Sequence, residues 1–307
     1  MDFHSALTLS SQLLDCDLYR DKNLSVHLIR SDQIHRQVSG NKWFKLKYSL
    51  LNAQRQDYQQ VISFGGAYSN HIHALAYACK NLALPVIGFI RGQWSEDNQT
   101  LQDARRWGMQ LKSLSREQYR EKTSAQFLAQ LSAEYPHSLI IPEGGSSIDA
   151  LRGVAELMGL IESAVPKIDT LVAACGTGGT LAGLISAAQQ TGSILGIPVL
   201  KGAGFLEDDI NGLLERAGLD AGCDWRLDLD GHYGGYGKAK ATHLQEMQVI
   251  ESLHKVQLEP VYTAKMWRRF DELVSDDYFK PGSVVALLHS GGLQGRRGFK
   301  LAQMNSR

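Results

Sequence analysis

The chain has 307 residues, of which 43% are hydrophobic and 21% charged, and its 32 basic and 32 acidic side chains give a formal net charge of zero. This balance provides no general attraction to nucleic acid or to an anionic membrane, so we expect neither as a partner. No apolar run is long enough to cross a bilayer, and the first residues lack a secretory-signal pattern. The cysteines, Cys16, Cys79, Cys175 and Cys223, form no C-x-x-C pair, which is typical of reduced thiols in a cytoplasmic protein.

Strand-like runs alternate with helix-like runs along most of the chain. Residues 1–23 are predicted to be irregular apart from a short helix. The predicted strands cover residues 24–30, 61–64, 85–91, 109–114, 139–141, 170–174, 194–200, 225–229 and 283–288. The predicted helices cover residues 43–56, 68–82, 98–107, 116–134, 148–161, 180–190, 205–217, 238–251 and 264–274. This alternation favours an α/β fold with mostly parallel sheets, in which ligands bind beyond the carboxyl ends of the strands.

One lysine stands at the junction between the first predicted strand and the first long helix. Lys42 lies in the segment S-G-N-K-W-F-K-L, residues 39–46. A lysine there is ordinarily a solvated charge in the first helical turn; alternatively, it is an amine that forms a Schiff base with a carbonyl cofactor. Position alone does not decide between these interpretations, but three later glycine-rich segments supply the other parts of a cofactor site.

The first glycine-rich segment, residues 63–71 (S-F-G-G-A-Y-S-N-H), follows a predicted strand and opens a helix. Ser69 and Asn70 are good N-cap residues, so a capped turn explains them without any ligand. The alternative places Asn70 beside a ligand, with Ser69 within reach of it.

The second segment, residues 174–180 (A-C-G-T-G-G-T), also joins a strand to a helix. Its backbone N–H groups and the helix dipole form an anion site, to which Thr177 and Thr180 add hydroxyl donors. The segment is not a P-loop, because no lysine ends it, and its glycine spacing departs from the dinucleotide fingerprint. We favour phosphate binding over a purely structural turn.

The third segment, residues 258–265 (L-E-P-V-Y-T-A-K), contains Tyr262 and Thr263, which taken alone would be a core aromatic and a helix cap. Residues 289–292 (H-S-G-G) end the last predicted strand in a further glycine turn. Together the segments provide an amine for an aldehyde, a polar contact for a ring, a phosphate cradle and a hydroxyl for a ring nitrogen.

This ordered set resembles the 1-aminocyclopropane-1-carboxylate (ACC) deaminase/D-cysteine desulfhydrase family, pyridoxal-phosphate enzymes of the tryptophan-synthase-β-like fold type II. The matching segments are residues 39–42, 65–66, 69–71, 142–146, 176–180, 236–237, 260–263 and 289–292. They keep the family order and cover nearly the whole chain. The resemblance implies two doubly wound α/β domains with pyridoxal 5'-phosphate between them, and a homodimer. The small domain, residues 45–147, is expected to be inserted into a large cofactor-binding domain made of residues 1–44 and 148–307.

The resemblance also implies a role for each matching residue that would hold the cofactor. Lys42 would bind the aldehyde covalently, Asn70 would hydrogen-bond the phenolic oxygen of the ring, and Thr263 would face the pyridine nitrogen. The residues that would hold the phosphate are Gly176, Thr177, Gly178, Gly179 and Thr180.

For the substrate, Ser69 would bind the carboxylate or help proton transfer, and Tyr262, with Tyr236, would flank it as stacking or acid–base groups. The implied reaction is β-elimination from a small amino acid to a 2-oxo acid and ammonia, with D-cysteine giving pyruvate, sulfide and ammonia. A neutral Thr263 makes the ring a weaker electron sink than a carboxylate would, so good leaving groups are favoured. The ring-opening deaminases carry glutamate there, and Tyr68 also departs from the family beside the expected substrate site.

Several alternatives remain open at this stage. Ring opening of ACC to 2-oxobutanoate and ammonia is the second hypothesis, and dehydration or racemisation of a serine-like substrate is the third. A pyridoxal-phosphate-binding protein without turnover and a nucleotide-binding Rossmann-type protein belong to different classes. Only the Rossmann-type protein would lack a visible chromophore.

Overall fold

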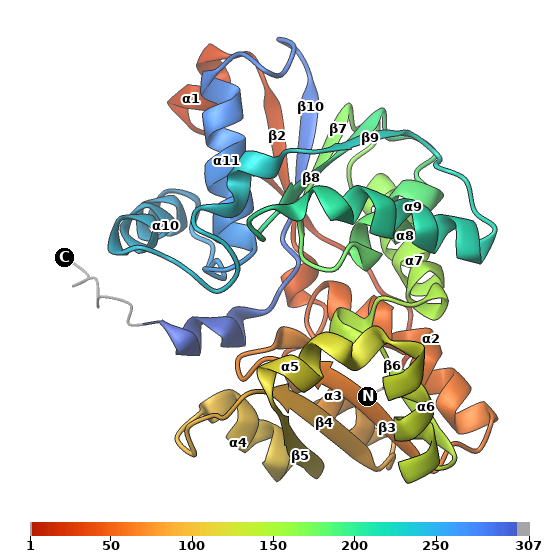
Figure 1. Cartoon of the computed structure of the whole chain (residues 1–307). Helices are drawn as coiled ribbons and strands as arrows, with labels where there is room; N and C mark the ends of the chain where they lie inside the picture. The colour runs from red at the N-terminus through yellow and green to blue at the C-terminus, as the bar shows by residue number, and fades with distance from the viewer. Residues whose placement is uncertain (1, 300–307) are drawn as a thin grey trace.

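The computed structural model describes residues 2–299, which form an upper and a lower lobe in Figure 1. Each lobe is built around its own sheet. The strands of the upper sheet come from residues 11–29 and 170–288, whereas those of the lower sheet all lie between residues 60 and 141. The predicted α/β class with mostly parallel sheets is confirmed.

The upper lobe contains a six-stranded sheet. Its strands are β1 (Ser11–Leu14), β2 (Ser25–Ile29), β7 (Thr170–Cys175), β8 (Ser193–Pro198), β9 (Asp224–Leu227) and β10 (Val284–Leu288). Their spatial order is β1-β2-β10-β7-β8-β9, and every neighbouring pair is parallel except β1 with β2. The central strands are apolar on both faces, as a sheet covered on both sides requires.

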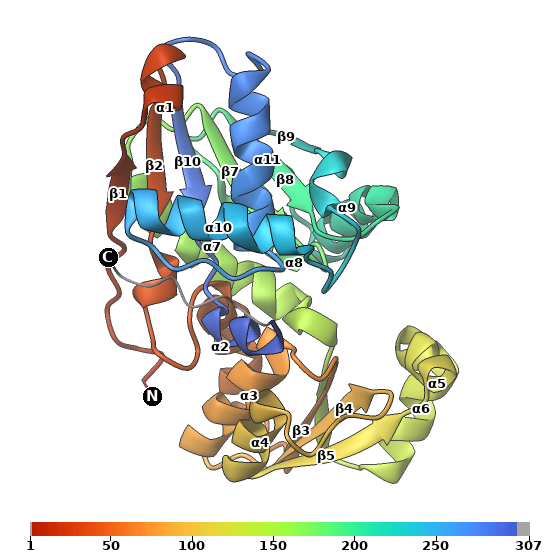
Figure 2. The same ribbon diagram turned by 90° about the vertical axis from the view of Figure 1, so that its left-hand side faces the viewer.

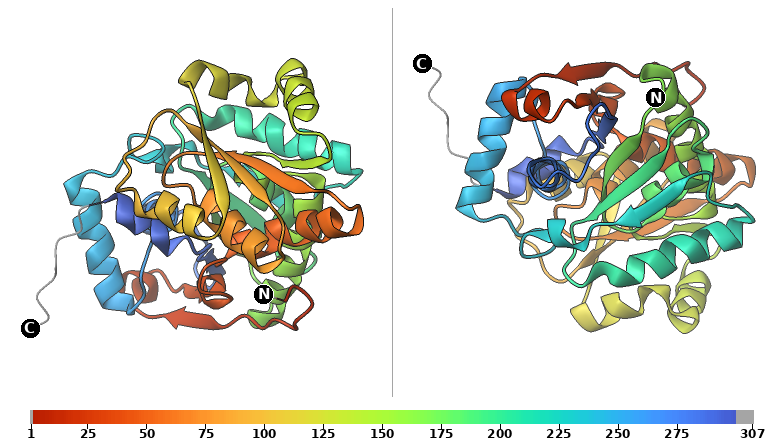
Figure 3. Two further views of the ribbon diagram at one scale, coloured as in Figure 1. Left: turned by 90° about the horizontal axis from the view of Figure 1, so that it is seen from below. Right: turned by 90° about the horizontal axis from the view of Figure 1, so that it is seen from above.

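Helices cover both faces of this sheet. They are α1 (Asp17–Asp21), α7 (Ile148–Ala164), α8 (Gly179–Ala187), α9 (Leu206–Ala217), α10 (Ala241–His254) and α11 (Thr263–Ser275). Helix α2 (Asn41–Arg55) lies below them and packs against α7 and α3. Because side chains alternate along a strand, Leu171 packs with the α7, α8 and α9 side and Val172 with the α11 side. The view from above in Figure 3 (right) shows α9 and α11 on opposite faces.

The lower lobe contains a four-stranded parallel sheet. Its strands are β3 (Gln60–Gly65), β4 (Val86–Arg91), β5 (Met109–Leu114) and β6 (Ser138–Ile141), in the spatial order β5-β4-β3-β6. Its helices are α3 (Asn70–Asn81), α4 (Gln99–Arg106), α5 (Arg116–Arg120) and α6 (Ala125–Glu134). Helices α3 and α4 lie on one face and α5 and α6 on the other, as Figure 2 shows.

Two sequence-based predictions differ from this structure. The single helix predicted over 116–134 is wrong, because it is divided into α5, a 3₁₀ turn (Glu121–Thr123) and α6. Ser124 accepts a hydrogen bond from the N–H of Phe127 at 3.2 Å and so begins a new helix. Residues 1–23 contain the edge strand β1 as well as the short helix α1.

The two-domain division remains a prediction. The division requires that the small domain be inserted into the large one, and the strands of the lower sheet do lie between β2 and β7 in the chain. The proposed boundary between Phe44 and Lys45, however, lies inside the continuous helix α2, so no linker occurs at that point.

Candidate active site

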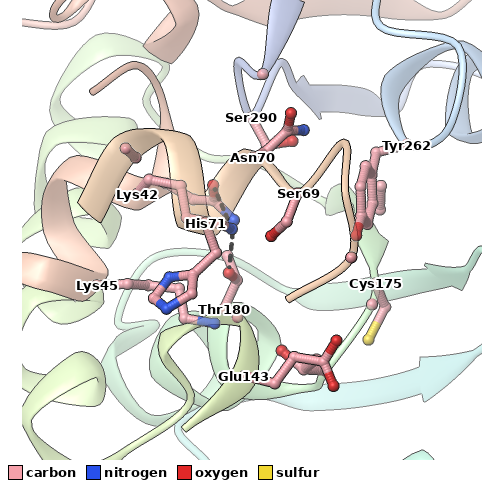
Figure 4. Close-up of a pocket in the computed structure, with 18 of the residues that line it drawn as sticks. Lys42, Lys45, Ser69, Asn70, His71, Glu143, Cys175, Thr180, Tyr262 and Ser290 are labelled. Atoms are coloured by element: carbon pink, nitrogen blue, oxygen red, sulfur yellow. Dashed lines mark hydrogen bonds between the residues drawn. The ribbon is translucent and has the colours of Figure 1, made fainter. Parts of the chain in front are cut away.

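A cavity of about 230 Å³ is lined by residues of both lobes, beyond the carboxyl ends of β3, β4, β7, β8 and β10. This is where an open α/β sheet is expected to bind its ligand. Figure 4 shows Lys42, Thr180, Ser69 and Tyr262 arranged around this space. Of the predicted site residues, those in the cavity wall are Lys42, Ser69, Asn70, Gly176, Thr177, Gly178, Thr180, Tyr236 and Tyr262.

Lys42 is placed by an unusually tight helix start. Gly40 precedes α2 with φ of +63°, and a Cβ there would lie 1.9 Å from the carbonyl oxygen of Ser290. Only glycine therefore lets α2 begin against the turn that follows β10. As a result, Lys42 Nζ lies in the cavity, 3.2 Å from Asn41 Oδ1.

The environment of Lys42 favours a reactive amine. Burial lowers the pKa of Lys42 to about 8, although the charge of Glu259 opposes the shift. A substantial neutral fraction at neutral pH makes the amine a nucleophile for a carbonyl group. Of the two interpretations of this lysine, the solvated surface charge is therefore excluded.

The loop after β7 forms an anion cradle at the N-terminus of α8. Gly178 has φ of +74°, and a Cβ there would lie 3.0 Å from Ile210, so a side chain has no room. Thr177 Oγ1 lies 2.7 Å from Ser146 Oγ, and Thr180 Oγ1 accepts from Asn41 Nδ2 at 2.8 Å. The helix dipole and the N–H groups of this turn suit a phosphate. Gly179 is outside the cavity wall: a Cβ there would lie 2.5 Å from Ser146 Oγ, so it serves close packing of the cradle.

Two buried cavity residues, Lys45 and His71, received no role from the sequence, although His71 belongs to a matching segment. Lys45 lies one helical turn after Lys42 and is buried, with Nζ donating to Ser146 Oγ at 3.0 Å. Burial and the charge of Lys42 hold its pKa well below the usual lysine range. The Lys42-x-x-Lys45 spacing on a helix was the available signal, since residues three apart share a face.

His71 is the second missed residue, and its tautomer follows from its partner. Ser63 Oγ donates its only proton to the carbonyl of Ile141 at 2.7 Å, so His71 Nε2 donates to Ser63 Oγ, also at 2.7 Å. His71 Nδ1 is then a buried acceptor without a partner among residues 2–299. Burial and the charges of Lys42 and Lys45 lower the pKa of His71 far below its usual value, so the ring is neutral.

Ser69 combines both interpretations that its sequence position allowed. It is the N-cap of α3, where Ser69 Oγ accepts from the N–H of Ile72 at 3.3 Å, and it also lies in the cavity wall. Because capping uses the oxygen as an acceptor, the hydroxyl proton stays available for a ligand.

Tyr262 and Tyr236 lie together on the wall opposite Lys42, where Figure 4 labels Tyr262. Their ring centroids are 6.0 Å apart in a T-shaped arrangement. A Cβ at Gly176 would lie 3.0 Å from the Tyr262 ring, which therefore packs directly on the phosphate loop. Burial raises the pKa of Tyr262, so its phenol is a neutral hydrogen-bond donor, whereas Tyr236 is partly exposed at the mouth of the cavity.

Thr263 is not brought together with the other predicted residues. It is fully buried and outside the cavity wall; its hydroxyl accepts from the N–H of Glu259 at 2.8 Å and donates to the carbonyl of Glu259 at 3.2 Å. The geometry therefore gives no support to a contact between Thr263 and a ring nitrogen. The hydroxyl that the wall offers in this region belongs to Ser290.

These residues fit pyridoxal phosphate. The amine of Lys42 is buried with a lowered pKa, the cradle before α8 excludes side chains, and the amine of Lys45 lies beside the cradle without a carboxylate partner in the described chain. Among residues 2–299 no cluster of side chains could hold a metal ion. None of the helices in the same range has the length and apolar character needed to span a membrane.

Comparison with known proteins agrees with this fit. Residues 22–291 match the family model described as "Pyridoxal-phosphate dependent enzyme". The chain is 29% identical over 291 residues to the bifunctional D-cysteine desulfhydrase/ACC deaminase of Arabidopsis thaliana, covering 87% of this chain and 72% of that relative. It is 25% identical to a D-cysteine desulfhydrase of Salmonella newport, with 87% and 86% covered.

The fold has a close counterpart among solved structures. An ACC deaminase homologue superposes with a TM-score of 0.80 at 25% identity, covering 95% of this chain and 91% of that one. A threonine deaminase from Solanum lycopersicum, at 16% identity and a TM-score of 0.66, shares the fold. The predicted fold type II is confirmed, and the Rossmann-type nucleotide-binding alternative is wrong. The chain belongs to the pyridoxal-phosphate dependent enzymes, and its cofactor is pyridoxal 5'-phosphate.

Proposed function

We propose that this enzyme converts D-cysteine and water to pyruvate, hydrogen sulfide and ammonia by β-elimination. The observation that carries this proposal is the cavity itself. It combines a buried, partly neutral amine with an anion cradle and two neutral tyrosines. The names of the relatives from Arabidopsis and Salmonella support the same reaction.

The chain's own residues supply the proton transfers. Bound pyridoxal phosphate supplies an electron sink for negative charge that develops at the substrate α-carbon. Lys42 Nζ would take the α-proton, because its lowered pKa suits a general base near neutral pH. We assign to Tyr262, whose phenol lies in the cavity wall, the donation of a proton to the departing sulfur.

Substrate orientation follows from the start of α3. Ser69 Oγ–H donates to the substrate carboxylate, and the helix dipole adds to the attraction. Tyr236 closes the same wall through its ring contact with Tyr262 and limits the length of the substrate side chain. Asn70 would hold the ring oxygen of the cofactor, and residues 176–178 and 180 with Lys45 would hold its phosphate.

Ring opening of ACC is the second candidate function, because the Arabidopsis relative carries both activities in its name and the solved counterpart is an ACC deaminase homologue. The neutral hydroxyl of Ser290, which stands in the wall where the ring-opening deaminases would need a carboxylate, favours elimination of a good leaving group over ring opening. A cofactor-binding protein without turnover is the remaining alternative.

The test compares purified wild type with Lys42→Ala, each incubated with D-cysteine, L-cysteine, D-serine and ACC. We expect sulfide and pyruvate from D-cysteine with wild type, and a loss on the order of 10³-fold in Lys42→Ala. Lys47→Met is the matched control on α2, since Lys47 pairs with Glu156 at 2.7 Å outside the cavity, and it should retain activity. Product from ACC alone would identify the reaction as ring opening. Bound cofactor without any product would indicate a cofactor-binding protein without turnover.

We further propose that the enzyme is a cytoplasmic homodimer. The cysteines are all unpaired, which suits a reducing compartment. Leu13 on β1 and Val249 and Leu253 on α10 are more than half exposed, and these elements are neighbours through the bond from Gln12 Nε2 to the carbonyl of His254 at 2.8 Å. Light scattering of wild type beside Val249→Lys would test whether this surface holds two copies together.

A further inference from the structure

Asn70 receives a hydrogen bond from the other lobe. Gln294 belongs to the 3₁₀ segment η6 (Leu293–Gly298) that follows β10, whereas Asn70 is the first residue of α3 in the lower lobe. Gln294 Nε2 donates to Asn70 Oδ1 at 2.8 Å, and both side chains lie in the cavity wall. The contact therefore joins the two lobes at the cofactor site.

This bond determines which end of the Asn70 carboxamide stays free. A carboxamide has one accepting oxygen and one donating nitrogen, and the oxygen is engaged by Gln294. Asn70 Nδ2 has no hydrogen-bond partner among residues 2–299 and lies beside Gly292, where a Cβ would approach it to 2.3 Å. The free group of Asn70 is thus a donor, and glycine at 292 leaves room for it.

The ring oxygen of pyridoxal phosphate is an acceptor, so it needs a donor. If Asn70 turned over, Oδ1 would face that oxygen, and Nδ2 would face the amide nitrogen of Gln294. The first contact would be repulsive in any case, and the second would be repulsive unless Gln294 turned as well, so the two amides can turn only together and the ring oxygen favours the orientation seen here. We propose that Gln294 is a positioning residue that fixes the Asn70 carboxamide so that Nδ2 donates to the ring oxygen of the cofactor. This inference rests on the role proposed for Asn70.

The test uses Gln294→Glu, which keeps the size of the side chain but can only accept. Asn70 must then turn Nδ2 towards the carboxylate and present Oδ1 to the cofactor. We expect about tenfold weaker binding of pyridoxal phosphate to the apoenzyme. We also expect the pH midpoint of the bound cofactor's visible absorbance change to rise by about one unit, because an oxygen without its donor holds a proton more tightly.

A double-mutant cycle separates this effect from the added charge. In an Asn70→Ala background, Gln294→Glu should shift both quantities clearly less than in wild type, because only the added charge still acts on the cofactor. Gln294→Leu, which is neutral, should shift the midpoint in the same direction by less. Arg297→Gln is the structural control: it breaks the neighbouring inter-lobe ion pair of η6 with Asp103, 2.6 Å in length, and should leave the midpoint unchanged.

The outcomes distinguish this inference from the proposed function. An unchanged midpoint in Gln294→Glu, with a shift in Asn70→Ala, overturns the inference and keeps the role of Asn70. A full shift that persists in the Asn70→Ala background also overturns it, as would an unchanged midpoint in Asn70→Ala itself. A shift that is clearly smaller in the Asn70→Ala background supports the inference. If the same enzyme forms no product from D-cysteine, only the proposed substrate is overturned.

Discussion

Lys45 carries a buried amine that lacks an ion-pair partner within residues 2–299, and a phosphate at the neighbouring cradle would supply one. We expect Lys45→Met to weaken binding of pyridoxal phosphate by about 10–100-fold, the range for a charge-assisted contact in a buried site. Binding of pyridoxal, which has no phosphate, should change little. Fluorescence titration of the apoenzyme with both ligands measures this, with Lys47→Met as control; an equal loss for both ligands would contradict the assignment.

The lowered pKa of Lys42 makes attachment of the cofactor dependent on pH. Only the neutral amine attacks the aldehyde, and burial brings the pKa to about 8 rather than the usual 10.5. The attachment rate to the apoenzyme should therefore rise about tenfold per pH unit below pH 8 and level off above it. Stopped-flow absorbance between pH 6 and 9.5 records the profile. A rate that still rises at pH 9.5 would indicate an unperturbed lysine.

At the scale of residues, the sequence predicted which segments meet but not every contact within them. Lys42, Asn70 and most of residues 176–180 lie where the motifs placed them. Thr263 does not, because adjacency to Tyr262 cannot show that its hydroxyl turns back to Glu259. Lys45 was missed because a helix-surface lysine becomes a cavity residue only when another segment covers it.

The crossing of α2 and α7 is what holds Lys42 in place at the scale of elements. Gly153 on α7 faces α2 so closely that a Cβ would lie 1.9 Å from the carbonyl oxygen of Phe44. Gly153→Ala should therefore force the helices apart and cost about 1–3 kcal/mol of unfolding free energy. It should also weaken cofactor attachment, since α2 carries the reactive amine.

A matched control lies on the same helix. Gly159 on α7 faces open space, since a Cβ added there would meet no atom within 4 Å. Gly159→Ala should therefore stabilise the protein by up to about 1 kcal/mol, through helix propensity alone. Urea unfolding of both apoenzyme variants measures the change in unfolding free energy that each substitution causes. Equal effects of the two substitutions would show that the crossing is not tightly packed.

Element prediction failed where side-chain capping overrides periodicity. The run 116–134 has helix-forming residues throughout, yet Ser115 forms a capping box with Gln118 and Ser124 begins a second helix. Both capping serines can be recognised in the sequence, but a serine at either position is also compatible with an uninterrupted helix. What decides between them is the packing of Tyr119 and Leu131 on the lower sheet, which the sequence does not reveal.

At the scale of the whole molecule, alternation of strands and helices predicted parallel sheets but not their order. Strand β10 lies between β2 and β7, so the centre of the upper sheet is completed by the last strand within residues 2–299. Long-range pairing of this kind leaves no local pattern. The same arrangement brings residues 289–292 and η6 against α2 and α3, so segments separated by about 250 residues meet at one cofactor site.

Because the cavity wall is shared, ligand binding should draw the two lobes together. Arg91 and Glu143 line it from the lower lobe, and Tyr236 and Tyr262 from the upper lobe. D-Alanine, which has no leaving group, should therefore slow amide hydrogen exchange in residues 91–98 and 142–147 of the holoenzyme several-fold. The distant turn at residues 276–283 serves as internal control and should not change. Equal protection of the lower-lobe segments with and without D-alanine would mean that the lobes are already closed around the cofactor.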